Sequence, residues 1–193
     1  NGADLVLNSS VESELVYGEG KAYGVEVYLK KRQGDFTGWV SYTLSRSLRK
    51  FGDIYDGKIF PSRQDRIHDL SITGIYKLNE KWSVSANFVF YTGDAVTFPT
   101  GKYRVNGTAV PYYTERNGDR FPNYHRLDLG ATWVVKKTKK FESSWNFSVY
   151  NAYGRQNAFV INFRENEDNP NITEAVQISL FSIVPSVSYN FRF

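Results

Sequence analysis

The stretch LFSIVPSVSYNFRF, residues 180–193, alternates apolar with mostly polar side chains at every second position. Its apolar set is Phe181, Ile183, Pro185, Val187, Tyr189, Phe191 and Phe193. A period of two is typical of a β-strand with one apolar and one polar face. An edge strand of a soluble sheet is rarely this long and carries a charge or a Pro on its exposed side. We therefore expect a paired neighbour for this strand and an apolar environment on one of its faces.

Six earlier segments show the same period, over about residues 22–32, 36–48, 68–78, 82–92, 124–136 and 142–153. In the fifth, the alternation places Leu127, Leu129, Ala131, Trp133 and Val135 opposite Arg126, Asp128, Thr132 and Lys136. No segment has a helical period. The pattern predicts an all-β fold of seven antiparallel strands.

The connections between these segments alternate in length. Short turns join three pairs of strands at residues 33–35, 79–81 and 137–140, whereas the other connections span about 49–67, 93–123 and 154–175. Strict alternation of short and long connections predicts an up-and-down meander with two unlike ends. Transmembrane β-barrels have this asymmetry, with short periplasmic turns and long outer loops. A soluble β-sandwich has no reason to collect its long loops at one end.

Segment length and composition agree with a transmembrane barrel. Each segment has roughly the 9–11 residues that a tilted strand needs to cross a bilayer. The mean hydropathy of −0.46 is ordinary because half of each barrel strand faces water. Aromatic residues make up 17% of the chain and are placed where interfacial girdles form, with Trp82, Trp133 and Trp145 near the short turns and Tyr42, Phe90 and Tyr153 near the long loops.

Charge and cysteine content exclude other classes. The net charge of +4 comes from scattered Lys and Arg, so a nucleic-acid partner is not indicated. The chain has no Cys and therefore no disulfide or thiolate metal site.

Strand parity leads to an expectation about the rest of the protein. Bacterial barrels have an even number of strands, and both chain ends lie on the periplasmic side. The seventh strand ends on the short-turn side, so counting back leaves the first strand starting on the long-loop side. We interpret residues 1–21 as the end of an outer loop and 1–193 as a partial outer-membrane β-barrel domain that follows at least one further strand.

Several stretches resemble the C-terminal barrel region of TonB-dependent outer-membrane receptors. These are GKAYGVEVYLKKRQGDFTGWVSYTLSRS, FPSRQDRIHDLSITGIYKL, FVFYTGDAVTFPTGKY, ERNGDRFPNYHRLDLGATW and VSYNFRF. The resemblance implies a larger barrel of twenty-two strands in the cell outer membrane, with a plug domain and a TonB-contacting segment upstream. It implies energised uptake of a scavenged nutrient, such as an oligosaccharide, a peptide or a metal chelate.

The resemblance also implies partners. These are the lipid bilayer, the barrel assembly machinery, the TonB complex through the upstream region, and a surface lipoprotein that binds substrate. The terminal residues Tyr189, Phe191 and Phe193 look like the signal that the assembly machinery reads.

Candidate contact residues fall into two groups. Inward charged side chains on the strands are candidates for contact with substrate or plug: Arg46, Arg66, Asp69, Arg126 and Asp128. Aromatic and basic side chains of the longest loop are candidates for sugar or peptide capture, or for packing of the loop on its neighbours: Tyr103, Tyr112, Tyr113, Arg116 and Arg120. We expect His68 and His125 to be hydrogen-bonding residues at the barrel rim, and the pairs Arg66/Asp69 and Arg126/Asp128 to balance charge on the inner wall.

No catalytic, cofactor or metal site is predicted. The chain has no Ser–His–Asp order, phosphate loop or paired-carboxylate motif. Glu165, Glu167 and Asp168 could bind Ca²⁺, although a solvated turn fits them better. An enzyme is not expected. A small structural, adhesive or enzymatic outer-membrane barrel stays open as the alternative to a transporter.

Overall fold

The computed structural model describes residues 15–169 and 172–193. In these residues the chain consists of strands, turns and one 3-10 turn, Tyr55–Gly57, with no α-helix. The prediction of an all-β fold is confirmed. The chain divides into two compact units. One comprises Arg46–Asp65, Asp94–Arg120 and the described residues up to Tyr23, and the other Gly24–Ser45, Arg66–Gly93 and the described residues from Phe121 to Phe193.

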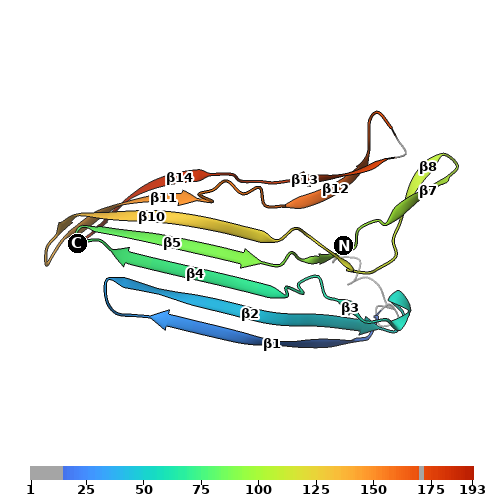
Figure 1. The fold of residues 1–193 in the computed structure, drawn as a ribbon, viewed down its shortest axis with the longest axis horizontal. Coiled ribbons are helices and arrows are strands. Elements are labelled where there is room, and N and C mark those ends of the chain that lie inside the picture. The colour runs from blue at the N-terminus through green and yellow to red at the C-terminus, as the bar shows by residue number, and fades with distance from the viewer. Residues whose placement is uncertain (1–14, 170–171) are drawn as a thin grey trace, which may run out of the picture. The chain divides into compact units, whose positions relative to one another are not determined.

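Seven strands form the main path of one large sheet in the order β1-β2-β4-β5-β10-β11-β14 (Figure 1). Their bounds are Gly18–Lys31, Phe36–Phe51, His68–Lys77, Trp82–Tyr91, Tyr124–Lys137, Glu142–Tyr150 and Val184–Arg192. A two-residue strand, β3 (Phe60–Pro61), pairs with β2 as the eighth member. The pairs from β2 to β14 are antiparallel. All seven predicted strands are present, and β1 begins earlier than predicted, at Gly18. The predicted outer-loop end at residues 1–21 falls mostly outside the described residues.

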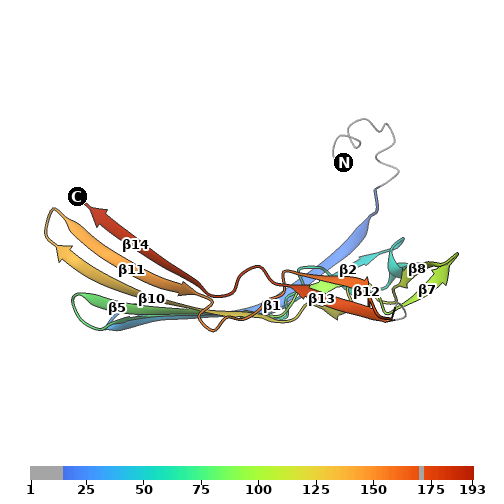
Figure 2. The ribbon, with the colours of Figure 1, turned by 90° about the horizontal axis from the view of Figure 1, so that it is seen from above.

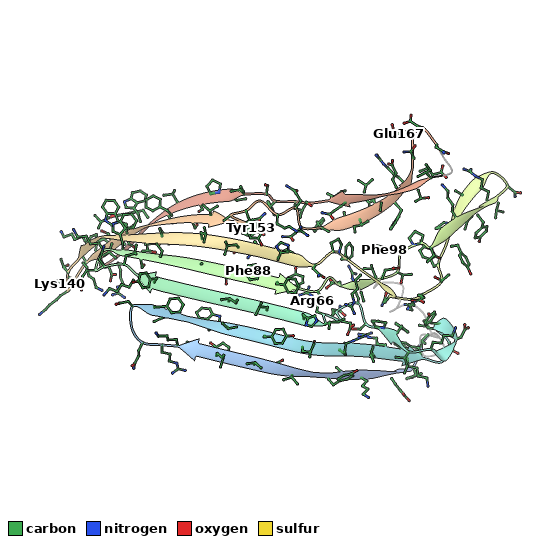
Figure 3. The ribbon with its side chains drawn as sticks, in the orientation of Figure 1. Arg66, Phe88, Phe98, Lys140, Tyr153 and Glu167 are labelled. Atoms are coloured by element: carbon green, nitrogen blue, oxygen red, sulfur yellow. The ribbon has the colours of Figure 1, made fainter. Side chains whose placement is uncertain are left out.

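Local side chains explain the short turns. Gly34 adopts φ +92°, a left-handed conformation that glycine reaches without strain, between β1 and β2. The Asn79 side-chain oxygen accepts hydrogen bonds from the backbone N–H groups of Lys81 and Trp82 and so fixes the turn before β5. The Thr138 hydroxyl bonds both backbone groups of Phe141 before β11. Lys140 marks this short-connection end in Figure 3.

The long connections contain three small sheets that the periodicity did not predict. β6 (Ala95–Val96) pairs with β9 (Asp119–Arg120), and β7 (Gly101–Val105) pairs with β8 (Thr108–Tyr112). β12 (Val160–Glu165) pairs with β13 (Thr173–Ile178) between β11 and β14. Figure 2 shows β14 and β11 rising away from β5, so the main sheet is curved. The described sheet is not closed, because β1 and β14 each have a neighbour on one side only.

Strand register aligns the side chains of the main sheet in rows. Trp82, Trp133, Trp145 and Tyr189 are in register across four strands, and the next row along contains Tyr76, Val84, Ala131, Phe147 and Val187. We call one side of the sheet the apolar face. This side carries the two rows and also Leu70, Ile72, Phe88, Phe90, Leu127 and Leu129. The opposite side is the polar face, which includes Thr43, Asp69, Ser71, Thr73, Ser85, Asn87, Arg126, Asp128, Thr132, Asn146 and Ser148.

One predicted facing is wrong. A β-bulge lies between Val134 and Lys136, so Lys136 pairs with Ser143 rather than continuing the alternation of the strand. Ser143 lies two positions from Trp145 and therefore on the same face of the sheet. Lys136, its partner in register, is thus on the apolar face rather than on the polar face where we expected it. A bulge inserts one extra residue into a strand and shifts every later side chain by one position.

The described residues bury almost no apolar side chains. Among residues 15–169 and 172–193, Phe60 and Ala95 are the only buried hydrophobic residues, whereas Ser62, Asp65, Thr92, Ser143 and Asn151 are buried polar or charged residues. Large side chains of the apolar face are exposed, including Leu129 at 43%, Phe147 at 39% and Val187 at 60%. Such a distribution is the reverse of that in a water-soluble domain, which buries its apolar face.

Candidate functional site

Three tyrosines gather on the polar face where the strands meet the long connections. Tyr91 and Tyr124 are in register on β5 and β10, and their rings stack with centroids 4.6 Å apart and planes 4° from parallel. The Arg66 guanidinium lies 4.1 Å from the centre of the Tyr91 ring. A guanidinium over an aromatic ring is attracted by the ring quadrupole. Arg66, labelled in Figure 3, therefore extends the Tyr91–Tyr124 stack by a third planar group.

Arg126 connects the third tyrosine to the other two. Its guanidinium lies 4.1 Å from the centre of the Tyr150 ring, and its Nη1 donates to the Tyr124 hydroxyl at 3.0 Å. Its Nε and Nη2 both contact Asp128 Oδ2, at 3.0 and 2.9 Å. The predicted pair of Arg126 and Asp128 is confirmed.

These tyrosines line a hollow of about 240 Å³. Its wall is made of Tyr91, Tyr124, Tyr150, Asn151, Asn157, Ala158, Phe159, Leu180 and Phe181. Both amide side chains in this wall are held by backbone groups: Asn151 donates to the carbonyls of Arg155 and Ser182, and Asn157 exchanges hydrogen bonds with the backbone of His125. The hollow therefore presents phenol hydroxyls and apolar rings. Its two side-chain amides are hydrogen-bonded to the backbone and stabilise the wall.

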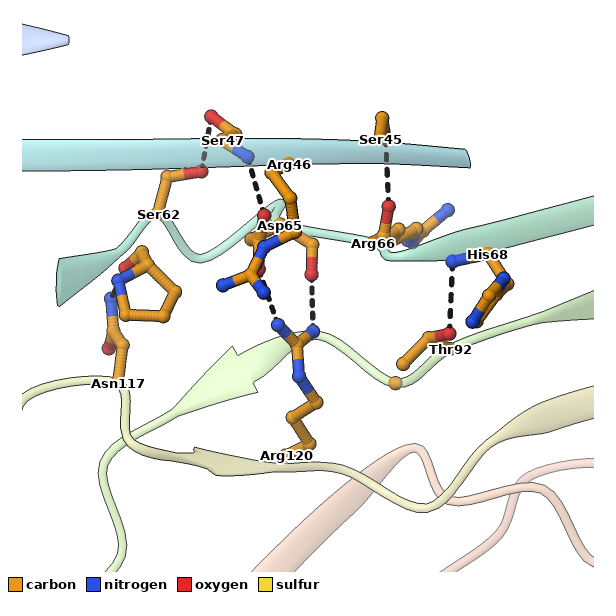
Figure 4. A network of polar contacts seen from close by, with 12 residues as sticks. Ser45, Arg46, Ser47, Ser62, Asp65, Arg66, His68, Thr92, Asn117 and Arg120 are labelled. Carbon is orange, nitrogen blue, oxygen red and sulfur yellow. Dashed lines mark hydrogen bonds and ion pairs between the residues drawn. The ribbon is translucent and has the colours of Figure 1, made fainter. Parts of the chain in front are cut away.

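A buried carboxylate organises the other unit (Figure 4). The Asp65 side chain is fully buried, accepts a hydrogen bond from the Ser47 backbone N–H, and forms an ion pair with Arg120. Arg120 also donates to the Asp65 backbone carbonyl. Arg46 Nε lies 3.4 Å from Asp65 Oδ2. Asp65 thus ties β2 to the segment that contains β9.

A second cleft lies in the same unit. It has a volume of about 460 Å³ and is lined by Tyr55, Thr97, Tyr113, Thr114, Glu115 and Arg116. The Arg116 guanidinium lies 5.2 Å from the Phe60 ring. Tyr55 has φ +56°, which is rare for a bulky side chain and is found mostly where the surroundings hold the backbone in place.

The structure brings together some of the predicted contact residues and separates others. Arg46 and Arg120 meet at Asp65, which the sequence reasoning missed. Arg66 contacts Tyr91, and its predicted pairing with Asp69 stays a prediction; Asp69 is in register with Tyr91.

The predicted residues of the longest loop lie in three places. Tyr113 and Arg116 line the second cleft, whereas Tyr103 and Tyr112 are exposed on the β7–β8 hairpin. Arg120 is bound to Asp65. The loop residues therefore do not form one cluster, and their role in capture of a sugar or peptide stays a prediction.

Both histidines form hydrogen bonds, as predicted, whereas their position at a barrel rim stays a prediction. Tyr42 Oη lies 2.9 Å from His68 Nδ1, and Tyr153 Oη lies 2.7 Å from His125 Nδ1. Both histidines lie on the apolar face, because His68 is in register with Leu44 and His125 with Phe90.

The predicted assembly-signal residues lie at the short-connection end. Tyr189 contacts Trp145 with ring centroids 4.9 Å apart, and Phe193 contacts Phe141 at 5.5 Å and Phe191 at 5.6 Å. The side chain of Phe193 is exposed.

The acidic turn between β12 and β13 is organised by hydrogen bonds. Asn166 accepts from the backbone N–H groups of Asp168 and Asn169, and its amide donates to Glu174. This amide, assisted by the Arg164 guanidinium at 3.2 Å, holds the pKa of Glu174 below its ordinary value. Within residues 15–169 and 172–193, no group of three or more His, Asp or Glu side chains is placed to hold a metal ion.

Comparison of the chain with protein-family models, with curated proteins and with solved structures finds no match. No helix in the described part of the chain has the length and apolar character needed to span a membrane.

Proposed function

We propose that this chain is part of an outer-membrane β-barrel that takes up a scavenged nutrient with energy supplied by a TonB complex. The observation that carries the proposal is the apolar face of the main sheet. Its large side chains are exposed or half-exposed, it continues in register from β2 to β14, and it is backed by a face of hydroxyl, amide and charged side chains. Such a sheet is suited to lipid on one side and a water-filled or plugged interior on the other.

The height of the apolar band supports the proposal. An aromatic row lies near the short connections at Trp82, and another lies at Phe90, eight positions further along β5. At about 3.3 Å per residue this is about 26 Å along the strand. A strand tilt of about 40° reduces the height to about 20 Å, close to the roughly 25 Å apolar band of membrane barrels.

Both edges of the sheet support a larger barrel. β1 has 14 residues, all of them exposed, and β14 has 9. Long uncovered edges present unpaired N–H and C=O groups, and in a membrane each such group needs a partner. Further strands of the same barrel would supply these partners and continue the curvature.

The tyrosine-lined hollow supports uptake rather than a purely structural barrel. It opens among polar-face residues, so it would face the route that a nutrient takes through the barrel. Aromatic rings with phenol hydroxyls and nearby guanidinium groups suit an oligosaccharide, a peptide or a chelate.

The experiment uses cells that make the whole protein, with and without a functional TonB complex. Growth is measured on single nutrients drawn from oligosaccharides, peptides and ferric chelates. We expect one nutrient to require both the protein and the energised complex. A protein missing from the outer membrane would refute the barrel. A growth benefit that persists without the complex would refute energised uptake, and an attachment defect without a nutrient defect would favour an adhesive barrel.

A variant pair tests the hollow in the same cells. Tyr150→Ala removes the ring that Arg126 covers and is expected to lower uptake per folded molecule. Tyr150→Phe keeps the ring and serves as the matched control for packing. Equal uptake by both variants and the parent would remove the hollow from the transport route.

A further inference from the structure

Two hydrogen-bonded tyrosine–histidine pairs lie on the apolar face at its long-connection end. In the first, the Tyr42 hydroxyl lies 2.9 Å from His68 Nδ1, and the rings are 6.2 Å apart and 23° from parallel. In the second, the Tyr153 hydroxyl lies 2.7 Å from His125 Nδ1, and the rings are 5.6 Å apart. Figure 3 labels Tyr153 close to the end of β11. Polar rings that occur twice among the apolar side chains at this end of the face call for a polar partner at that level.

Both pairs stand at one level of the sheet. Tyr42 is in register with Leu70, Leu70 with Phe90, and Phe90 with His125, so the row crosses four strands. His68 lies two positions beyond Leu70 on β4, in the direction of the long connections. In the proposed barrel this row marks the upper limit of the apolar band, where lipid headgroups begin.

In each pair the tyrosine hydroxyl lies at Nδ1 and leaves Nε2, at the other side of the ring, outside this contact. When a phenol donates to Nδ1, the neutral imidazole carries its proton on Nε2 at the other side of the ring. In the part of the chain that the structure describes, neither His68 nor His125 has a hydrogen-bond partner at Nε2. An N–H at the membrane interface without a protein partner favours an acceptor from the lipid or from water.

We propose that the two pairs bind phosphate groups of lipids in the leaflet that faces the long connections. The inference rests on the proposed membrane barrel, though not on uptake. Each pair supplies an imidazole N–H, and phosphate oxygens are strong acceptors for such donors. Arg155 is exposed and close enough to His125 for its charge to act on the imidazole, which adds attraction for an anion.

Neighbouring side chains favour a lipid over a free phosphate ion. Leu70 and Phe90 lie between the two pairs in the same row, and Ile72 and Phe88 lie directly below in register. Acyl chains can cover these side chains while the headgroup meets the imidazoles. A free phosphate ion would gain nothing from this apolar surface and would be better held by a cluster of converging donors.

The test uses the whole protein, extracted from outer membranes in a mild detergent and studied by native mass spectrometry. It is titrated with phosphatidylglycerol and, separately, with a diacylglycerol that carries a glucose headgroup. The double variant His68→Phe/His125→Phe keeps both rings and removes the nitrogens. We expect its phosphatidylglycerol binding to weaken about fivefold for each pair lost, the factor expected for one hydrogen bond, with glucolipid binding unchanged. Phe90→Leu, in the same row, is the matched control.

The other outcomes of this titration decide whether the histidine pairs bind the lipid phosphate. Unchanged phosphatidylglycerol binding by the double variant overturns the proposal, and so does displacement of the lipid by an equal concentration of inorganic phosphate. If the histidine variant does not fold, Tyr42→Phe/Tyr153→Phe removes only the phenol partners and is expected to weaken phosphate-lipid binding in the same direction. Membrane fractionation of the same samples tests the barrel separately. A barrel that binds the lipid but transports nothing refutes uptake alone.

Discussion

Arginine at Val149 tests which face of the sheet meets lipid. Val149 is in register with Leu129 and Pro185 and lies four positions from Trp145, the aromatic row of the short-connection end. Four positions are about 13 Å along the strand and about 10 Å across the membrane at a tilt of about 40°. Val149 therefore lies at the middle of the apolar band. Val149→Arg should lower the free energy of unfolding by about 2–4 kcal/mol, the cost of an Arg at the midplane of a barrel.

Ser148→Arg is the matched control, one position away on the polar face. Its neighbours in register are Gly130 and Ser186, both small, so the long side chain has room. We expect this substitution to cost less than about 0.5 kcal/mol, as for a surface position. Phe147→Arg, one row nearer to the aromatic level, should cost less than Val149→Arg because the penalty falls toward the interface.

The assay is urea unfolding of the whole protein in lipid vesicles, followed by heat-modifiable migration on a gel. The folded fraction at each urea concentration gives the free energy of unfolding for each variant. Equal destabilisation by the arginines at Val149 and Ser148 would refute the assignment of the faces. A larger cost at Ser148 would reverse it.

Three further perturbations probe other parts of the chain. Asp65→Asn removes the charge of the buried carboxylate that forms an ion pair with Arg120. This substitution should destabilise the local fold by about 3 kcal/mol, and the loss should be seen as faster protease cleavage within residues 94–120. The Asn166 amide lowers the pKa of Glu174, so the stabilisation of the β12–β13 hairpin by this hydrogen bond is present above the ordinary pKa of 4.5 and is lost as the pH falls through the lowered pKa. The protection of the hairpin amides against hydrogen exchange, measured relative to the intrinsic rate at each pH, should therefore decrease in that range. Phe193→Ala should reduce the amount of folded barrel in the outer membrane, with uptake per folded molecule unchanged.

Each of these perturbations has its own control. Asp56→Asn alters an exposed carboxylate, 90% accessible beside Lys58, and should leave cleavage unchanged. Glu174→Gln should remove the pH dependence of the hairpin amides, and a dependence that survives this change would contradict the assignment. Normal insertion of Phe193→Ala with poor uptake would place Phe193 in the transport function rather than in assembly.

The alternation of apolar and polar residues predicted the strands well, because the face to which each side chain points is determined within its own strand. In a half-apolar strand, the pleat assigns every second side chain to one face whatever its neighbours do. The bulge between Val134 and Lys136 was not predicted, because an extra residue in one strand is defined only against its partner strand, and the local sequence remains apolar through Val135. The hairpins within the long connections were missed because strands of two to six residues are too short for a period to stand out.

The site residues likewise divide into those that one strand places together and those that only the tertiary fold brings together. Arg126 and Asp128 are two positions apart on one strand, so the pleat itself places both on the polar face, and their ion pair was predicted. Asp65 and Arg120 are 55 positions apart, and only the path of two long connections brings them together. The segment FPSRQDR, which contains Asp65, carried part of the family resemblance, although its spacing gave no sign of which partner the carboxylate has.

The buried polar residues explain how the long connections keep a fixed form although the described residues bury almost no apolar side chains. Ser62, Asp65, Thr92 and Asn151 all lie in the long connections. The first three bond groups of another segment, and Asn151 joins the two ends of its own connection by donating to the carbonyls of Arg155 and Ser182. If lipid covers the apolar face, little apolar burial is left to hold the loops, and directional hydrogen bonds must do so. A bond of this kind fixes one geometry and is expensive to leave unmade once its groups are buried. Within its own unit, each of the two sites, the hollow and the second cleft, would therefore owe the fixed positions of its aromatic and guanidinium groups to a few buried polar side chains.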